Sequence, residues 1–404
     1  MAVNNPDIET ELKTLASGNL LRRLRNQQSR GVTRALIDGC EAVLFAGNDY
    51  LGLSAHPRVL AAARRALERY GSSAGASRLV TGNHPLFQSL EENLARFKGK
   101  EAALVFPSGY MANLGFLAAM AGPDDLVFSD RLCHASLYDG LRLSGARFRR
   151  YRHNDAGHLG RLLSREDPKG RLLIVTDGIF SMDGDLAPLP EIRVLADRHG
   201  CLLAVDDAHG TGVIGPGGRG TATLLGVKPE IETGTLSKAA GSLGGFVAGS
   251  RELVDYLVNK ARPFIFTTGL PPASVAAADA ALGLFEEEGW RRERVLKLAA
   301  RARLVLGRAG FRIPGNGVGP NRAETFSETP ATPIVPLITG DEKLALRLSS
   351  LCLNRGIFIP AIRNPAVPKN QARLRMTLSA AHSDEELNRA LEVLTESGGE
   401  LGLI

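Results

Sequence analysis

The residues best suited to covalent chemistry lie in the segment 233–238, Thr-Gly-Thr-Leu-Ser-Lys. Its one lysine, Lys238, follows hydroxyl residues and precedes the small residues of 239–245. A lysine that forms a Schiff base needs a pocket of small residues, hydroxyl groups nearby and an amine whose pKa can be lowered. Because most lysines are solvated, the sequence around Lys238 does not by itself identify a Schiff-base lysine. This interpretation depends on residues elsewhere in the chain.

Further polar groups follow the ends of predicted strands. Asp206 ends an apolar run, where a carboxylate can hold a cation inside the fold, and His134 comes just after another strand end. Segment 108–110, Ser-Gly-Tyr, opens a helix whose exposed backbone N–H groups and dipole favour an anion such as phosphate. A lysine, a buried acid, a phosphate-binding helix start and a flat imidazole are the parts that hold pyridoxal 5′-phosphate.

Strands that alternate with helices must position these groups. Apolar runs predict strands at 43–45, 102–106, 126–128, 171–177 and 201–206. Helical spacing and end signals predict helices at 7–29, 57–70, 84–98, from 108 onwards and 189–199. Continuous apolar strands between helices favour a mainly parallel sheet covered on both faces, with ligands at the carboxyl ends of its strands. We therefore expect these strand-end residues to converge: Ser108, Asp130, Asp177, Asp206 and Thr235.

The length of 404 residues exceeds that of one typical domain. Near residue 285 the pattern changes to a charged helix at 285–309, strands at 332–338, 356–359 and 373–378, and helices at 341–355 and 383–397. We predict an N-terminal helical segment (1–45), a large α/β domain that binds the cofactor (46–284) and a smaller C-terminal α+β domain (285–404).

Charge and composition argue against several classes of protein. The net charge of +6 is spread along the chain without a basic tail, so we expect no nucleic-acid partner. No apolar run reaches the roughly 18 residues that a membrane span needs. The N-terminus does not resemble a targeting segment, and the four cysteines form no close pair, so we expect reduced thiols in a cytoplasmic protein.

Three other kinds of site are less well supported. Asp206 and His209 could form half of a metal site, but further ligands at recognisable spacing are missing, so we expect no metal. Segment 215–220 matches the glycine pattern of dinucleotide-binding loops but does not join a strand to a helix, which argues against a nicotinamide oxidoreductase. Ser181 lies outside the G-x-S-x-G turn of hydrolases, so a triad with His209 and Asp206 is rejected.

Four longer motifs identify a family. They are Asn-Asp-Tyr-Leu-Gly-Leu at 48–53, Asp-Gly-Ile-Phe-Ser-Met-Asp-Gly at 177–184, Asp-Asp-Ala-His-Gly-Thr-Gly at 206–212 and Thr-Leu-Ser-Lys at 235–238. In them the chain resembles the α-oxoamine synthase family of fold-type I pyridoxal-phosphate enzymes, over nearly its whole length. The resemblance implies an α/β fold with a mainly parallel central sheet flanked by helices, and a smaller C-terminal α+β domain.

The resemblance also implies roles for single residues. Lys238 would bond the cofactor's aldehyde and later remove the amino acid's α-proton, Asp206 would keep the pyridine nitrogen protonated, and His134 would stack on the ring. His209 is the fourth residue with an implied catalytic role. Other cofactor contacts would come from Ser108, Gly109, Tyr110, Ser181, His209, Thr235, Ser237, Thr267 and Thr268. Because the family's site lies at a dimer interface, a homodimer is implied, with Thr267 or Thr268 reaching the other subunit's phosphate.

Substrates follow from the same resemblance. The implied substrate-binding positions are Arg22, Asn48, His134, Arg363, Ala366 and Arg375. The fork of Arg375 would bind the amino-acid carboxylate, and Arg22, on the predicted first helix, would contact the acyl substrate. Ala366 stands where the family usually has a threonine, so one hydroxyl is missing.

Within the family, segments 75–84, 264–272 and 361–363 resemble one branch most. That branch condenses L-alanine with a pimeloyl thioester, pimeloyl-CoA or pimeloyl-ACP, in biotin biosynthesis. The nearest alternative is 2-amino-3-ketobutyrate ligase, which uses glycine and acetyl-CoA. A catalytically inactive protein of this fold is a further alternative, against which the presence of Lys238, Asp206, His134 and His209 argues.

Overall fold

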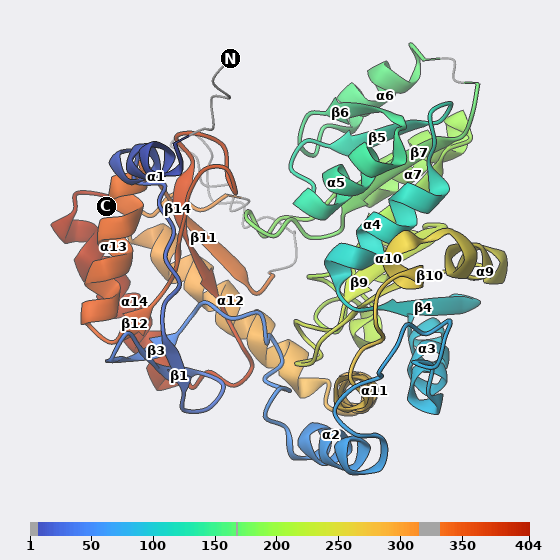
Figure 1. Ribbon diagram of the computed structural model, residues 1–404. Coiled ribbons are helices and arrows are strands. Elements are labelled where there is room, and N and C mark those ends of the chain that lie inside the picture. The colour runs from blue at the N-terminus through green and yellow to red at the C-terminus, as the bar shows by residue number, and fades with distance from the viewer. Residues whose placement is uncertain (1–6, 167–168, 315–331) are drawn as a thin grey trace. The chain divides into compact units, whose positions relative to one another are not determined.

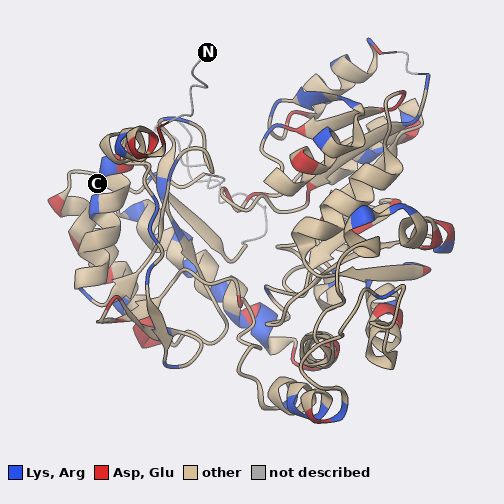
Figure 2. Cartoon of the chain, viewed as in Figure 1, with Lys and Arg blue, Asp and Glu red and all other residues tan. Residues whose placement is uncertain are grey.

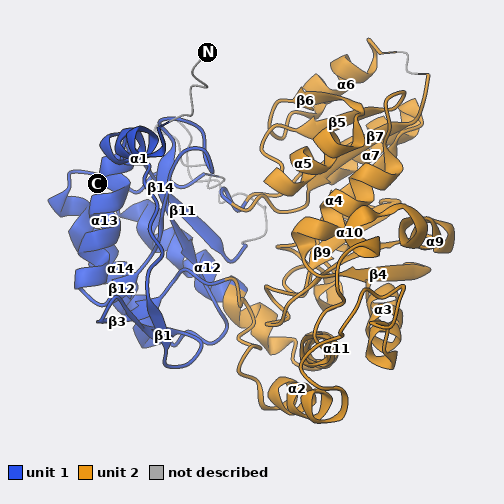
Figure 3. Cartoon of the chain, viewed as in Figure 1, with its two compact units in different colours: residues 1–47, 182–184, 296–404 blue, residues 48–181, 185–295 orange. Residues whose placement is uncertain are grey.

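The computed structural model describes residues 7–166, 169–314 and 332–404 (Figure 1). The chain divides into two compact units, which are described one at a time (Figure 3). Unit 1 comprises residues 1–47, 182–184 and 296–404, and unit 2 comprises residues 48–181 and 185–295. The N-terminal segment therefore belongs to the same unit as the C-terminal part of the chain. Helix α12 (Trp290–Arg308) carries the chain from unit 2 into unit 1.

Unit 2 is built on a seven-stranded sheet with the order β4-β10-β9-β8-β7-β5-β6. The strands are β4 (Ala102–Phe106), β5 (Leu126–Asp130), β6 (Arg147–Tyr151), β7 (Leu172–Asp177), β8 (Leu202–Asp206), β9 (Ile231–Thr235) and β10 (Gly245–Gly249). Strand β10 is antiparallel to β4 and β9, and the other four pairings are parallel. The predicted mainly parallel sheet is confirmed.

Apolar side chains on both faces of this sheet explain why its strands are continuously hydrophobic. Leu173 and Val175 pack in one buried cluster, whereas Ile174, which lies between them in β7, packs in another. The first cluster includes residues of α4 (Gly109–Met120), α5 (Ala135–Ser144), α9 (Arg251–Lys260) and α10 (Arg262–Ile265). The second includes residues of α6 (Ala156–Leu163), α7 (Leu189–His199) and α8 (Thr221–Leu224). Helices therefore cover both faces of the sheet, as Figure 1 shows.

The remaining helices of unit 2 pack together beside β4. They are α2 (Pro57–Tyr70), α3 (Pro85–Lys98) and α11 (Pro272–Glu287), and α11 contacts both α2 and α3. A short 3₁₀ turn, η1, covers Pro216–Gly218. The helices predicted at 57–70 and 189–199 have these bounds in the structure, because each begins with a proline in its first turn and ends at a glycine.

The described residues of unit 1 form two small sheets. The first has the order β1 (Gln27–Ser29), β2 (Arg34–Ile37), β3 (Cys40–Leu44) and β12 (Ile357–Phe358), in which β12 is parallel to β3. The second has the antiparallel order β11 (Ile334–Gly340), β14 (Ala372–Thr377) and β13 (Ala361–Ile362). Three helices complete the unit together with α12: α1 (Ile8–Ser17), α13 (Glu342–Asn354) and α14 (Asp384–Glu400). The sheet formed by the N-terminal strands β1, β2 and β3 thus gains its fourth strand, β12, from the C-terminal part of the chain.

Two of the predicted helices differ from the structure. The helix predicted at 7–29 ends at Ser17, because Gly18 caps it and Asn19 takes a left-handed backbone conformation with φ of 56°. The leucines that suggested its continuation do not form a buried face, since Leu24 is fully exposed. The helix predicted at 285–309 begins only at Trp290, because the chain leaves the helical conformation after α11, at Glu288.

Charged residues are distributed over the elements of both units. Figure 2 shows lysine and arginine interspersed with aspartate and glutamate in each of them. Among the described residues, no helix combines the length and the apolar character needed to cross a bilayer.

Candidate active site

The ends of the parallel strands bring several predicted polar residues of unit 2 together. Asp177 and Asp206 are register partners at the ends of β7 and β8, and Asp206 pairs with Thr233 of β9. The backbone N–H of His134, at the start of α5, donates to Asp177 Oδ1 over 3.1 Å. Groups from three strands and one helix therefore meet at one edge of the sheet, as expected for an open α/β sheet.

The two carboxyl groups at this edge have different surroundings. Asp206 Oδ1 accepts the N–H of Ala208 over 3.0 Å, and its Oδ2 accepts an N–H of Asn113 over 2.6 Å. Burial, and then the nearby negative charge of Asp206, raise the pKa of Asp177 well above its usual value. Two adjacent buried carboxyl groups do not both ionise readily, which is the physical reason for the raised pKa of Asp177.

Lys238 lies in a tight turn directly after β9. Its carbonyl oxygen accepts the N–H of Gly241 over 2.9 Å. Gly241 has a φ of +61°, and a Cβ atom there would lie 2.4 Å from the backbone nitrogen of Ser54. The turn that presents Lys238 therefore requires glycine at position 241, both for its backbone conformation and for the close approach of the neighbouring chain.

A line of polar side chains leads from Lys238 into the interior of unit 2. Lys238 Nζ lies 3.0 Å from His209 Nε2. The other nitrogen of His209, Nδ1, lies 2.7 Å from the hydroxyl of Tyr50, and that hydroxyl donates to Asn48 Oδ1 over 3.1 Å. These contacts fix the His209 ring and give the lysine amine a polar neighbour that can exchange a proton with it.

The start of helix α4 forms the predicted phosphate-binding region. Ser108 is its N-cap and accepts the N–H of Met111 over 3.1 Å. A Cβ atom at Gly109 would lie 3.1 Å from Cβ of Thr235, and one at Gly245 would lie 2.4 Å from the Gly109 nitrogen. The backbone at the helix start is thus packed so closely that side chains are excluded from it.

Hydroxyl groups lie beside this helix start. The Thr235 hydroxyl donates to the carbonyl oxygen of Gly244 over 2.9 Å and lies 2.7 Å from the hydroxyl of Ser237. The hydroxyl of Tyr110 donates to Asp139, and the Tyr110 ring stands edge-on to His134 with 6.3 Å between ring centroids. This arrangement brings hydroxyl groups, a helix N-terminus and the imidazole of His134 into one region.

These groups fit pyridoxal 5′-phosphate. The buried carboxylate of Asp206 suits a protonated pyridine nitrogen, and Lys238 supplies an amine for an aldehyde. The glycine-lined start of α4 and the hydroxyls of Thr235 and Ser237 suit a phosphate, since a helix N-terminus attracts anions.

Three further predicted cofactor residues lie in unit 2 without a contact that tests their role. Ser181 follows the buried Phe180 in the turn after β7. Thr268 forms an isolated antiparallel bridge with Ser77, next to Thr267. Their roles toward the cofactor remain predictions.

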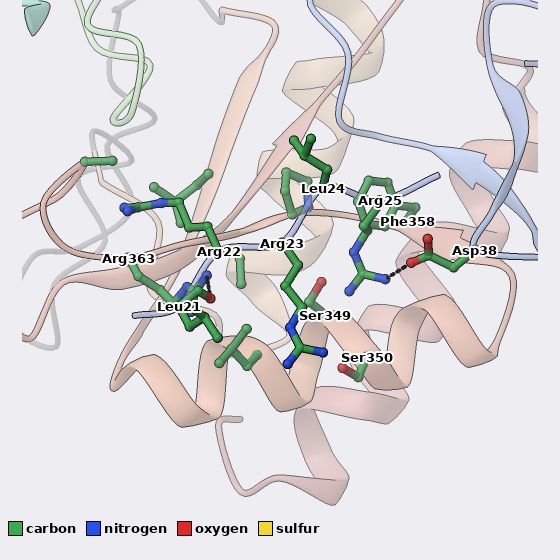
Figure 4. A pocket seen from close by; sticks show the side chains of 15 residues that line it. Leu21, Arg22, Arg23, Leu24, Arg25, Asp38, Ser349, Ser350, Phe358 and Arg363 are labelled. Atoms are coloured by element: carbon green, nitrogen blue, oxygen red, sulfur yellow. Dashed lines mark hydrogen bonds and ion pairs between the residues drawn. The ribbon is translucent and has the colours of Figure 1, made fainter. Parts of the chain in front are cut away.

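Unit 1 holds three of the predicted substrate-binding residues in one pocket. Arg22, Arg363 and Ala366 line a cavity of about 770 Å³, together with residues of α13 and β13 (Figure 4). Arg22 was expected on a helix but lies in the extended segment between α1 and β1, since α1 ends at Ser17.

The pocket is positively charged. Arg22 donates to the carbonyl oxygen of Asn364 over 3.1 Å, and Arg363 donates to the carbonyl oxygens of Asn19 and Leu21. Burial, and then the nearby charge of Arg22, lower the pKa of Arg363. Two guanidinium groups that are held by carbonyl oxygens keep their net charge, so the pocket favours an anion.

Arg375, the predicted partner of the amino-acid carboxylate, lies in β14 of unit 1 and is buried. The guanidinium of the nearby Arg373 contacts Asp183 Oδ1 over 2.7 Å, which gives Arg373 a structural role. The role of Arg375 remains a prediction.

Sequence reasoning did not single out three residues of the site in unit 2. Tyr50 lies inside the motif 48–53, so its contact with His209 could have been suspected. Asn113 and Ser136 lie in helices α4 and α5, where the sequence gives no sign that they are buried. Asn113 and Ser136 are 2% and 0% exposed, and both belong to a network around Asp206.

Comparisons with known proteins identify the family. The family model Aminotransferase class I and II matches residues 41–394. Two relatives with the name 8-amino-7-oxononanoate synthase, from Geobacter metallireducens and Geobacter sulfurreducens, are each 48% identical to the chain. The first alignment covers 98% of this chain and 98% of the relative, and the second covers 98% and 99%. The chain therefore belongs to the aminotransferase class I and II family.

Solved structures agree as well. A serine palmitoyltransferase from Sphingomonas wittichii has a TM-score of 0.89 and 33% identity, and the match covers 99% of this chain and 98% of that one. An 8-amino-7-oxononanoate synthase from Francisella tularensis has a TM-score of 0.74 and 27% identity, with coverage of 90% and 99%. These matches confirm the predicted fold class and the resemblance to α-oxoamine synthases.

Proposed function

We propose that this enzyme condenses L-alanine with a pimeloyl thioester, with loss of carbon dioxide, to give 8-amino-7-oxononanoate and the free thiol carrier in biotin biosynthesis. The observation that carries the proposal is the placement of the Lys238 amine 3.0 Å from His209, in the unit that also holds the buried carboxylate of Asp206. The name 8-amino-7-oxononanoate synthase, which curated relatives 44–49% identical to this chain bear, supports the choice of reaction.

The cofactor of this enzyme is pyridoxal 5′-phosphate, which withdraws electrons from the α-carbon of an amino acid so that bonds to that carbon can break. Lys238 would hold the cofactor covalently and then take up the α-proton, because its amine lies beside His209, with which it can exchange that proton. Asp206 would pair with the protonated pyridine nitrogen, and His134 would lie against the ring face. The helix start at Ser108–Tyr110, with Thr235 and Ser237, would bind the phosphate.

The amino acid and the thioester would be bound by charged groups. Arg375 would bind the carboxylate of alanine, because a planar guanidinium suits that group, and Asn48 would contact the same substrate. Arg22 and Arg363 would bind an anionic part of the acyl substrate, since the pocket that they line is positively charged. Ala366, at the same pocket, supplies no hydroxyl for this purpose.

The proposal includes a homodimer in which Thr267 or Thr268 of one subunit reaches the phosphate bound by the other. A cytoplasmic location is proposed with it, in keeping with small-molecule substrates.

The experiment is an absorbance titration of the purified holoenzyme with L-alanine, glycine and L-serine in turn, followed by addition of pimeloyl-CoA. We expect a spectral change selective for L-alanine, and 8-amino-7-oxononanoate as the product. A change selective for glycine would contradict the proposal and favour the 2-amino-3-ketobutyrate ligase reaction, and one selective for L-serine would favour serine palmitoyltransferase activity.

The variant Lys238→Ala controls this experiment. It should lower turnover at least about a thousandfold, because the lysine acts as the base, while the unfolding midpoint stays close to that of the wild type. Near-normal product formation by Lys238→Ala would remove Lys238 from its role and with it the proposed mechanism.

A further inference from the structure

A buried asparagine on α4 is bound at every hydrogen-bonding position of its side chain. Asn113 Nδ2 donates one proton to Asp206 Oδ2 over 2.6 Å and the other to Ser136 Oγ over 2.9 Å. Its Oδ1 accepts the hydroxyl of Thr233, on β9, over 2.7 Å. Since the hydroxyl of Thr233 donates to the oxygen, the amide cannot be turned over without loss of these bonds, and its orientation is fixed.

The orientation of Asn113 fixes the next hydrogen bond as well. Ser136 Oγ accepts a proton from Asn113, so its own proton is available for His134 Nδ1, which lies 2.7 Å away. The backbone N–H of Ser136 also points to His134 Nδ1, over 3.3 Å. Two donors face this nitrogen, so Nδ1 is an acceptor and the proton of the neutral imidazole lies on Nε2.

Protonation of Nδ1 would disturb this arrangement. The hydroxyl of Ser136 would then face two donors, His134 and Asn113, and its own proton would lose its acceptor in a place where Ser136 is fully buried. An unsatisfied buried donor is costly, so the network opposes the charged form of the imidazole. Burial acts in the same direction and lowers the pKa of His134.

Several other charged and polar groups surround His134. The charges of Asp206 and Asp139 favour a protonated ring, whereas the charge of Lys238 opposes it. Asp177 binds the backbone N–H of His134, and Tyr110 approaches the ring edge-on without forming a hydrogen bond to it among the described contacts. None of these groups fixes the position of the proton on the ring, which leaves this role to Ser136 and Asn113.

We propose that Asn113 is a positioning residue that links the carboxylate of Asp206 to the tautomer of His134 through the hydroxyl of Ser136. Asp206 and His134 are the two residues assigned above to the nitrogen and to the face of the cofactor ring, so this inference deepens the proposed function and rests on it. The amide of Asn113 holds the carboxylate of Asp206 in place and at the same time keeps the neighbouring imidazole of His134 neutral. A change in the hydrogen bonding of Asp206 should therefore alter the protonation of His134.

The test uses Asn113→Leu, which keeps the approximate size of the side chain and removes its donors and acceptor. Three properties are measured in the absence of amino acid and thioester: the dissociation constant of pyridoxal 5′-phosphate, the pH midpoint of its visible absorbance when bound, and the pKa of His134 from ¹⁵N NMR. We expect the cofactor to bind about tenfold to a hundredfold more weakly, because a hydrogen bond to a buried carboxylate is lost. The absorbance midpoint and the pKa of His134 should each move by about one unit, the latter upward.

A double-mutant cycle isolates the link itself. Ser136→Ala keeps the bond between Asn113 and Asp206, so cofactor binding should stay within about threefold of the wild type while the pKa of His134 rises. In a Ser136→Ala background, Asn113→Leu should weaken cofactor binding but no longer change the pKa of His134. If Asn113→Leu does not fold, Ser136→Ala still tests the proposal. An unchanged pKa of His134 in the Ser136→Ala variant would overturn it.

The matched control is Asn93→Leu, which breaks another asparagine–aspartate bond of unit 2. Asn93 Nδ2 donates to Asp279 Oδ1 over 2.7 Å, between α3 and α11. This variant should leave all three measured properties unchanged, and parallel changes in it would mean that general destabilisation explains the result. A wild-type protein that does not bind the cofactor would refute the proposed function. If the wild type binds the cofactor and the variants show the same three properties as the wild type, only the positioning role of Asn113 is refuted.

Discussion

The histidine His153 links three segments of unit 2, and its charge can be tested directly. His153 Nδ1 lies 3.0 Å from Asp130 Oδ1, and its Nε2 lies 2.9 Å from Asp185 Oδ2. The ring also stands edge-on to Phe180, with 4.4 Å between centroids. Burial opposes the charge on His153, but the hydrogen bonds to Asp130 and Asp185 outweigh it and raise its pKa from 6.5 to about 10.

The size of this contribution follows from the pKa difference between the folded and the unfolded chain. A rise from 6.5 to about 10 corresponds to at most about 5 kcal/mol of folding free energy. The side chain of His153 is 16% exposed, so screening by water reduces this figure, and we expect about 3 kcal/mol. Because the folded state binds the proton more tightly, the stabilisation is complete below pH 6.5 and is lost as the pH rises toward 10.

The assay compares urea unfolding of the wild-type holoenzyme with that of His153→Gln at several pH values between about 6 and 9.5. The variant should be about 3 kcal/mol less stable at the acid end, and the difference should shrink as the pH rises. Loss of the contact with Phe180 does not depend on pH, so the slope reports the charge alone. His199→Gln, which removes a histidine from the last turn of α7, is the control variant. A stability difference of His153→Gln that stays constant over this range would refute the reasoning.

Two further variants test other parts of unit 2. The side chain of Lys98 is fully buried, and its Nζ lies 3.0 Å from Asp207 Oδ2 and 2.7 Å from Glu232 Oε2. Lys98→Met should therefore destabilise the protein by about 3–5 kcal/mol, measured as a lower urea midpoint. An unchanged midpoint would contradict the assigned ion pairs. Gly245→Ala would place a Cβ atom 2.4 Å from the nitrogen of Gly109 and so displace the start of α4. Equilibrium dialysis should then show pyridoxal 5′-phosphate bound at least about tenfold more weakly, whereas wild-type affinity would exclude this helix start as the phosphate site.

The elements that carry the site were predictable where an apolar run in the sequence marks a buried strand and a polar residue follows its end. Asp206 and Thr235 lie where the sequence placed them, because the ends of parallel strands must meet at one edge of the sheet. The extent of the first helix was not predictable, because α1 has no buried residue and Leu24, which continued the pattern of leucines, is fully exposed. Propensity alone is a weak guide when a segment buries no face.

The polar network was not predictable either. An asparagine in a helix is mostly solvated, and only the packing of α4 against the sheet shows that Asn113 lies beside Asp206. Nothing in the sequence indicates that the hydroxyls of Thr233 and Ser136 turn toward the same amide. Motifs therefore predict the charged residues of the site. The residues that orient them can be identified only from the tertiary contacts.

The pairing of β3 with β12 has a consequence for the way in which the chain folds as it is made. Val43 pairs with Ile357, so the strand partner of β3 is synthesised about 310 residues after it. At roughly 5–20 residues per second, β3 waits on the order of 15–60 s for that partner. All of unit 2 emerges from the ribosome in this interval, while β1, β2 and β3 can form only a meander in which the β3 edge that later receives β12 is unpaired. The nascent chain thus carries an exposed strand edge near its amino end during most of its synthesis, which is the period of greatest risk of association with other chains.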